Sequence, residues 1–301
     1  MKTNNKYDVI IIGGSYAGLS AAMALGRAMR HVLIIDSGKP CNRQTPHSHN
    51  FLTQDGNTPE GIAKISKAQV MQYPTIEFME GKVTRVGGEN NQFVVYNSEG
   101  QAMAAKKILF ATGLKDLMPK IRGFADCWGI SVIHCPYCHG YEYRNEQTGI
   151  FVNGDMAFEF ARLINNWTKK LTVFTNGVSA IDKSHREQLV QLNIDVVETP
   201  IQEVRHTNGI LDKLIFADGS GTKITALYAK LPFEQHSDIP INLGCQMTDA
   251  GHIQTDDFQK TSIPGIYAAG DNANMFRTLS MTVAAGTKAG AIINQELIAE
   301  S

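Results

Sequence analysis

The sequence predicts an α/β protein with two Rossmann-like nucleotide-binding domains, and three observations support this. Residues 6–29 read as a strand, a glycine-rich turn and a helix. Residues 148–164 repeat the order of strand, turn and helix. The length of 301 residues exceeds the size at which a single hydrophobic core usually keeps growing. We therefore expect the two units to be separate domains.

The N-terminal unit has the order of a dinucleotide-binding βαβ motif. A β-branched apolar run over 6–12 breaks at the turn 13–18, and an Ala- and Leu-rich helix is expected over 19–29. A second strand over 31–35 ends at Asp36, where a carboxylate can bind a ribose hydroxyl. A glycine-rich turn in some other α/β protein is the alternative interpretation.

Small residues in this turn predict contact with a pyrophosphate. Gly13 permits the sharp turn, and Gly18 permits close packing of the helix on the strand. Ser15 replaces the middle glycine of the usual motif but is small enough to be tolerated, and Ala17 completes the turn. The helix N-terminus then offers its backbone N–H groups to the phosphates.

Composition excludes several classes of protein. Hydrophobic residues make up 43% and charged residues 19%, which is typical of a folded globular chain. The 28 basic and 29 acidic residues nearly balance, with no basic run, so neither nucleic acid nor a membrane surface is an expected partner. Apolar runs are too short to cross a bilayer, and no targeting segment is recognised, so a cytoplasmic location is expected.

The segment Cys135-Pro136-Tyr137-Cys138-His139 carries the most specific chemical signal. A C-x-x-C pair at a helix start can close a disulfide, and the helix dipole lowers the pKa of one thiol, so the pair predicts dithiol–disulfide exchange. A zinc site that adds Cys127 and a neighbouring histidine is the alternative. Three cysteines have no close partner in sequence and are expected to be inert packing residues: Cys41, Cys127 and Cys245.

Two later segments indicate which dinucleotide binds. A strand over 107–110 ends in Ala111-Thr112-Gly113, and another over 265–269 ends in Gly270-Asp271. In this order, after a glycine motif, they resemble the two-dinucleotide-binding flavoprotein disulfide reductases. The resemblance implies bound FAD, with Asp271 holding the ribitol and a helix starting near Met281 and Thr282 directed at the flavin ring.

The same resemblance assigns a flavin contact to the segment 43–51. There the family wraps a loop beside the flavin, and Asn50 is the candidate contact to the ring or the ribityl chain. His47 and His49 in this loop are either proton relays or solvated surface residues.

The placement of the C-x-x-C pair, shortly before Gly154, resembles that in the low-molecular-weight thioredoxin reductases. This resemblance extends over nearly the whole chain. By that resemblance Cys138 is the sulfur next to the flavin, and Cys135 is the outer sulfur that exchanges with substrate. His139 stands where those enzymes have an aspartate, and it is a candidate general acid/base. A surface histidine is the alternative.

The resemblance also implies the domain organisation. A discontinuous FAD domain, 1–117 with 243–301, should contain an inserted domain over 118–242, each with a three-layer ββα architecture. Antiparallel strands are expected over 78–98 and 209–225 because of their turn signals. A homodimer is expected because the family is dimeric.

The second nucleotide site looks degenerate. Its turn reads Val152-Asn153-Gly154-Asp155, where bulky side chains and a negative charge replace the expected glycines. No arginine that could pair with the 2′-phosphate of NADPH occurs between positions 162 and 186. The later apolar segment at the nicotinamide side, 228–233, is altered as well. NADPH is therefore not the expected electron donor.

Three functions remain open at this stage. The chain resembles dithiol oxidases related to gliotoxin oxidase, in which C-x-x-C-H-G is followed by an aromatic residue and Glu, here Tyr141-Glu142. That resemblance implies oxidation of a small-molecule dithiol with O2 as the acceptor. The second function is reduction of a thioredoxin-like protein with electrons from ferredoxin or another donor. The third is a flavin-binding redox sensor without turnover.

Overall fold

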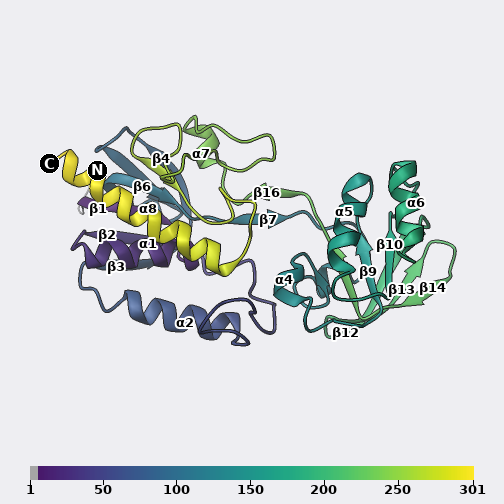
Figure 1. Cartoon of the computed structure of the whole chain (residues 1–301). Helices are drawn as coiled ribbons and strands as arrows, with labels where there is room; N and C mark the ends of the chain where they lie inside the picture. Colours follow the sequence, from purple (N-terminus) through teal and green to yellow (C-terminus); the bar gives the residue numbers. More distant parts are fainter. Residues whose placement is uncertain (1–5) are drawn as a thin grey trace. The chain divides into compact units, whose positions relative to one another are not determined.

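The computed structural model describes residues 6–301, which divide into two compact units (Figure 1). The first unit comprises the chain up to Arg43 together with 50–115 and 233–301. The second comprises 116–232 and the short segment 44–49. The sequence had placed 44–49 in the first domain, but these residues pack with the second unit. Gly129 explains this contact, because a Cβ there would come within 3.0 Å of the Gln44 side chain.

A seven-stranded sheet forms the centre of the first unit, with strand order β3-β2-β1-β6-β5-β4 and β17 paired with β6. Its strands are β1 (Lys6–Ile12), β2 (Val32–Asp36), β3 (Ile76–Glu80), β4 (Val83–Gly87), β5 (Phe93–Asn97), β6 (Ala102–Phe110) and β17 (Ile266–Ala268). β4 and β5 run antiparallel, as expected for 78–98. Residues 78–80 are the exception, because they lie in β3, which pairs with β2 in parallel.

Alternating side chains of β1 separate two apolar layers. Val9 and Ile11 face a core that contains the helices α1 (Tyr16–Arg27) and α8 (Leu279–Ala299). Ile10 and Ile12 face the opposite core, beneath β4 and β5. Side chains of a strand point alternately to its two faces, so a strand buried on both sides reads as a continuous apolar run. Helix, parallel sheet and antiparallel sheet thus form three layers in this unit.

Small residues allow α1 and α8 to pack closely. A Cβ at Gly286 would lie 2.1 Å from the Ala17 carbonyl oxygen, and one at Gly290 would lie 2.6 Å from that of Ala21. The helix boundaries differ slightly from those expected. α1 begins at Tyr16 and ends before Met29, which has a left-handed φ of 60°.

Two further helices, α2 (Pro59–Val70) and α7 (Ile239–Asn242), complete the first unit. The segments that cross between the units also pair, through β7 (Leu114–Asp116) and β16 (Phe233–Gln235).

The second unit repeats the α/β plan with a five-stranded parallel sheet of order β11-β10-β9-β15-β8. These strands are β8 (Val132–Ile133), β9 (Thr148–Phe151), β10 (Leu171–Phe174), β11 (Asp195–Val197) and β15 (Ala226–Ala229). Its helices are α3 (Phe124–Cys127), α4 (Pro136–His139), α5 (Asp155–Ile164) and α6 (Lys183–Gln191). An antiparallel sheet covers the other side, formed by β12 (Ile201–Thr207), β13 (Ile210–Phe216) and β14 (Gly221–Lys223). The predicted α/β class with two Rossmann-like units is confirmed.

A buried ionic network ties the C-terminal end of α8 to the sheet of the first unit. The Lys107 side chain is fully buried, and its Nζ donates to Asn90 Oδ1 at 2.7 Å and to Glu296 Oε1 at 2.8 Å. Nζ also lies 2.7 Å from Glu300 Oε2. Burial alone would raise the pKa of Glu296, but hydrogen bonds from Lys107, Lys260 and Tyr267 outweigh it and lower the pKa to about 2.

Lys107→Met is expected to lower the free energy of unfolding by about 3–5 kcal/mol, because it leaves two carboxylates without their shared buried partner. Urea unfolding followed by circular dichroism measures the change. Lys106→Met is the matched control, because Lys106 pairs with Asp8 at 2.8 Å on a side chain that is 38% exposed. That variant should change stability by less than about 1 kcal/mol. Equal losses in the two variants would contradict this account of the network.

Candidate functional site

Three neighbouring parallel strands of the first unit end at one edge of the sheet. Ile12 pairs with Phe110, and Phe110 pairs with Ala268. The predicted cofactor segments follow these strands directly, beginning at Gly13, at Ala111 and just after Ala269. Ligands of open α/β sheets bind at the carboxyl ends of the strands. The structure therefore brings the three segments together at such an edge.

The glycine turn has no room for a side chain at Gly13 or at Gly18. Gly13 has a left-handed φ of 107°, and a Cβ there would lie 2.2 Å from the Ala111 carbonyl oxygen. A Cβ at Gly18 would lie 1.9 Å from the carbonyl oxygen of Gly13. Ser15 is the N-cap of α1 without a capping bond from its side chain, so its hydroxyl does not occupy the N–H groups of the first turn. This turn fits a bound pyrophosphate.

The Asp36 carboxylate closes the glycine turn from the side of β2. One oxygen accepts a hydrogen bond from the Gly14 N–H at 2.6 Å, and the other accepts one from the Gly38 N–H at 2.7 Å. Carboxylate oxygens accept more than one bond each, so Asp36 retains acceptor capacity for a ribose hydroxyl.

Asp271 connects its strand end with the start of α8. It accepts a hydrogen bond from Thr282 Oγ1 at 3.3 Å and lies 3.4 Å from Arg277 Nε. α8 begins two residues before the predicted Met281, with Thr278 as its cap. The Gly270 position, with φ 95°, is close-packed, because a Cβ there would lie 3.1 Å from Ala17 Cβ.

Asn272 is a buried residue of this edge that the sequence did not single out. Its amide donates to the Phe110 carbonyl at 2.9 Å and to Thr112 Oγ1 at 3.5 Å, next to Gly113 with its φ of 66°. It thus ties the segment after β17 to the segment after β6. Its place directly after Gly270-Asp271 was the only available signal.

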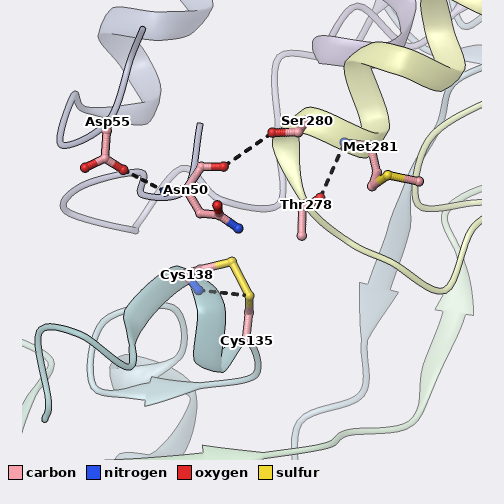
Figure 2. The surroundings of a disulfide bond; sticks show 7 residues. All are labelled: Asn50, Asp55, Cys135, Cys138, Thr278, Ser280 and Met281. Atoms are coloured by element: carbon pink, nitrogen blue, oxygen red, sulfur yellow. Dashed lines mark hydrogen bonds between the residues drawn. A yellow bond between two sulfur atoms is a disulfide. The ribbon is translucent and has the colours of Figure 1, made fainter. Parts of the chain in front are cut away.

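Asn50 is held by its backbone in a left-handed conformation, with φ 58°. Its N–H donates to Asp55 Oδ1 at 2.7 Å, and its carbonyl accepts from Ser280 Oγ at 3.3 Å (Figure 2). The side-chain amide of Asn50 takes no part in these two bonds. The structure therefore places Asn50 beside the N-terminal turn of α8, within the same unit.

The C-x-x-C pair begins α4 in the second unit. Cys135 is the N-cap, its Sγ accepts a hydrogen bond from the Cys138 N–H at 3.1 Å, and the two sulfurs form a disulfide (Figure 2). The Cα atoms lie 5.3 Å apart, within the usual range for a disulfide. Cys135 is buried, whereas Cys138 and His139 are half-buried. Burial, with a smaller electrostatic contribution from His49, lowers the pKa of His139 to about 4.

A family model described as pyridine nucleotide-disulphide oxidoreductase matches residues 7–290. The chain belongs to this family. A thioredoxin reductase, sirT, from Leptosphaeria maculans is 31% identical over 96% of this chain and 93% of its own length. The oxidoreductase from Agrobacterium tumefaciens shares 36% identity at a TM-score of 0.92, covering 98% of this chain and 100% of that one. A putative thioredoxin reductase from Bacillus anthracis shares 29% identity at a TM-score of 0.93, covering 98% and 99%.

Membership of the family establishes the general chemistry. The disulphide oxidoreductase is a flavoprotein that binds FAD and acts on sulfur groups. Over residues 6–301, no helix combines the length and the apolar character needed to cross a bilayer. In the same range no group of three or more His, Cys, Asp or Glu side chains is arranged to hold a metal, and the disulfide occupies two of the three sulfurs that the zinc alternative needed.

The remaining cysteines of the oxidoreductase differ in their surroundings. Cys127 and Cys245 are buried, and burial raises the pKa of the Cys127 thiol to about 11, which keeps it protonated. Cys41 is exposed, so the expectation that it is a packing residue is wrong. It lies in the irregular segment that follows β2, where the chain leaves the core.

The oxidoreductase has an unusual phosphate-loop region in its second unit. The Asn153 side chain fills the turn between β9 and α5. Its Oδ1 accepts hydrogen bonds from the Gly154 N–H at 2.7 Å and the Ala180 N–H at 2.9 Å, and its Nδ2 donates to the Val178 carbonyl at 3.0 Å. Backbone N–H groups at such a turn are the usual phosphate donors. Here the protein's own amide takes one of them, that of Gly154, and links the turn to Ala180 in the segment before α6.

Asp155 occupies the N-terminal turn of α5 in the same region. Its carboxylate accepts from the Asp182 N–H at 3.0 Å and lies 2.9 Å from His185 Nδ1. The His185 ring stacks on Phe158, with centroids 4.3 Å apart. A hydrogen bond from His185 is the largest influence on Asp155 and lowers its pKa, so the carboxylate stays ionised where a phosphate would carry its own negative charge.

Proposed function

We propose that this disulphide oxidoreductase oxidises a dithiol to a disulfide through Cys135 and Cys138, passes the electrons to FAD, and uses O2 as the final acceptor. The observation that carries the proposal is the combination of a closed C-x-x-C disulfide with a second nucleotide turn filled by Asn153 and Asp155. The first feature provides thiol exchange, and the second argues against NADPH as the donor.

In the proposed reaction each side chain has a distinct task. A substrate thiol attacks Sγ of Cys135, the outer sulfur, and Cys138 leaves as the thiolate that passes the electrons to FAD. His139, uncharged at neutral pH because of its lowered pKa, accepts the proton of the attacking thiol. When bound, FAD supplies a two-electron acceptor for the reduced pair and a donor to O2.

The proposed FAD site uses residues of the first unit alone. We assign the pyrophosphate to the turn formed by Gly13, Ser15, Ala17 and Gly18, and the adenosine ribose to Asp36. The other proposed cofactor contacts are Asn50, Ala111, Thr112, Gly113, Gly270, Asp271, Met281 and Thr282. A homodimer and a cytoplasmic location belong to the same proposal.

The test is anaerobic addition of a dithiol such as dithiothreitol to the FAD-loaded enzyme. We expect loss of the oxidised flavin absorbance, which returns when air is admitted, with hydrogen peroxide formed in proportion to dithiol consumed. Bleaching that does not reverse in air would favour the redox-sensor alternative.

Reduction of a thioredoxin-like protein is the second candidate, because relatives such as that from Leptosphaeria maculans are named thioredoxin reductases. It requires a donor other than NADPH. Fast bleaching by reduced ferredoxin, followed by reduction of thioredoxin, would favour this candidate over dithiol oxidation.

A further inference from the structure

A histidine and a carboxylate lie close to His139 within the second unit. His49 Nε2 is 3.7 Å from Glu142 Oε1. Glu142 belongs to the turn that follows α4, and His49 ends the segment 44–49. The separation slightly exceeds the length of a hydrogen bond. Glu142 lies in the turn that starts at His139, because the His139 carbonyl accepts a hydrogen bond from the Tyr143 N–H at 3.4 Å.

The segment 44–49 packs with the second unit, although its neighbours in sequence on both sides belong to the first unit. Gly129 has φ 77° and leaves space for the side chains of Gln44 and Thr45. A Cβ at Gly129 would lie 3.0 Å from each of these two side chains. The His49 side chain is 23% exposed and that of Glu142 is 38% exposed. The pair is therefore partly open to solvent, in the turn that follows half-buried His139.

His139 needs a second proton acceptor. Its pKa of about 4 means that the ring takes a proton from a thiol only briefly and must release it before it can accept the next. Histidine and carboxylate groups both exchange protons readily with water. Other titratable or charged side chains near this pair include His47, Tyr141, Tyr143, Arg144 and, from β15, Tyr228.

We propose that His49 and Glu142 form a relay that carries protons from His139 to solvent while the Cys135–Cys138 disulfide is reduced by substrate. The inference rests on the proposed function, because it deepens the thiol-exchange step. Two protons have to be moved in each cycle. His49 and Glu142 act through His139 and are positioning residues for its proton transfer.

Atoms and electrons balance as follows. The first substrate thiol gives its proton to His139, and its sulfur bonds to Cys135 as the bond to Cys138 breaks. The second substrate thiol also loses its proton, and its sulfur attacks the substrate sulfur of the mixed disulfide. Cys135 then leaves as a thiolate. The products are a substrate disulfide, two protein thiolates that hold the two electrons, and two protons delivered to water.

The test follows reduction of the disulfide by dithiothreitol, using rapid alkylation and mass spectrometry across a range of pH. This measurement needs neither flavin turnover nor O2. His49→Gln and Glu142→Gln should each slow the reduction about 10-fold near neutral pH. The double variant should be no slower than either single variant, because the two residues act in one path. Added imidazole should restore the rate of His49→Gln.

His206→Gln is the matched control. His206 Nε2 lies 3.5 Å from Asp126 Oδ2, and its side chain is 22% exposed, close to that of His49. It should leave the rate unchanged. Parental rates in His49→Gln and Glu142→Gln would overturn the relay. A slow variant with an unaltered pH profile and no rescue by imidazole would also overturn it, since a structural role predicts that result. If the relay variants behave as expected but flavin and O2 do not turn over, the proposed function fails and the relay stands.

Discussion

Cys138→Ser is expected to stop dithiol-driven reduction of the flavin, with a loss of about 10³-fold or more in rate. In the proposed reaction Cys138 is the sulfur that passes electrons to FAD, and a serine hydroxyl can neither form the disulfide nor hold the electrons of a thiolate. Anaerobic stopped-flow absorbance with dithiothreitol measures the rate. A variant that bleaches as fast as its parent would remove the cysteine pair from the mechanism.

The exposed Cys41 supplies the control for this substitution. Cys41→Ser removes a thiol that is more accessible than either member of the pair, and it should leave the bleaching rate unchanged. A loss in both variants would point to a general effect on the flavin site.

Cys135→Ser separates the roles of the two sulfurs. The outer sulfur is assigned to exchange with substrate, so Cys138→Ser should trap a mixed disulfide on Cys135 when it is mixed with oxidised substrate. Cys135→Ser should trap none, which mass spectrometry detects. A mixed disulfide on Cys138 of Cys135→Ser, with none on Cys135 of Cys138→Ser, would reverse the assignment. The comparison is informative because Cys135, the assigned outer sulfur, is buried.

NADPH is expected to reduce the flavin about 10³-fold more slowly than a dithiol does, even at about 1 mM, where a working site would be close to saturation. Asn153 Oδ1 already accepts from the Gly154 and Ala180 N–H groups. The Asp155 carboxylate adds a negative charge at the start of α5, where a pyrophosphate would lie. NADH should behave in the same way.

The measurement is anaerobic flavin absorbance with each donor in turn, and the dithiol serves as the positive control in the same preparation. Bleaching by micromolar NADPH would contradict the interpretation of the second turn. It would leave the thiol chemistry of Cys135 and Cys138 in place, since that chemistry does not depend on the donor.

The sequence by itself determined the elements whose signals are local. The apolar run before Gly13, the small residues of the turn and the acid at Asp36 predicted the first βαβ unit, because sterically demanding turns restrict the residues that can form them. The C-x-x-C spacing predicted a disulfide at a helix start, which the structure shows between Cys135 and Cys138. The bulky residues at 152–155 indicated an altered second turn for the same steric reason.

Contacts between distant segments were decided only by the tertiary structure. The packing of 44–49 against Gly129, the bonds of Asn153 to a segment 27 residues away, and the Lys107 network with the C-terminal helix join positions that no local pattern relates. Strand β3 illustrates the same limit. Residues 78–80 were expected in an antiparallel pair because of a nearby turn signal, yet they pair in parallel with β2. Strand pairing and buried charge depend on which surfaces meet after folding, and that information is spread over the whole chain.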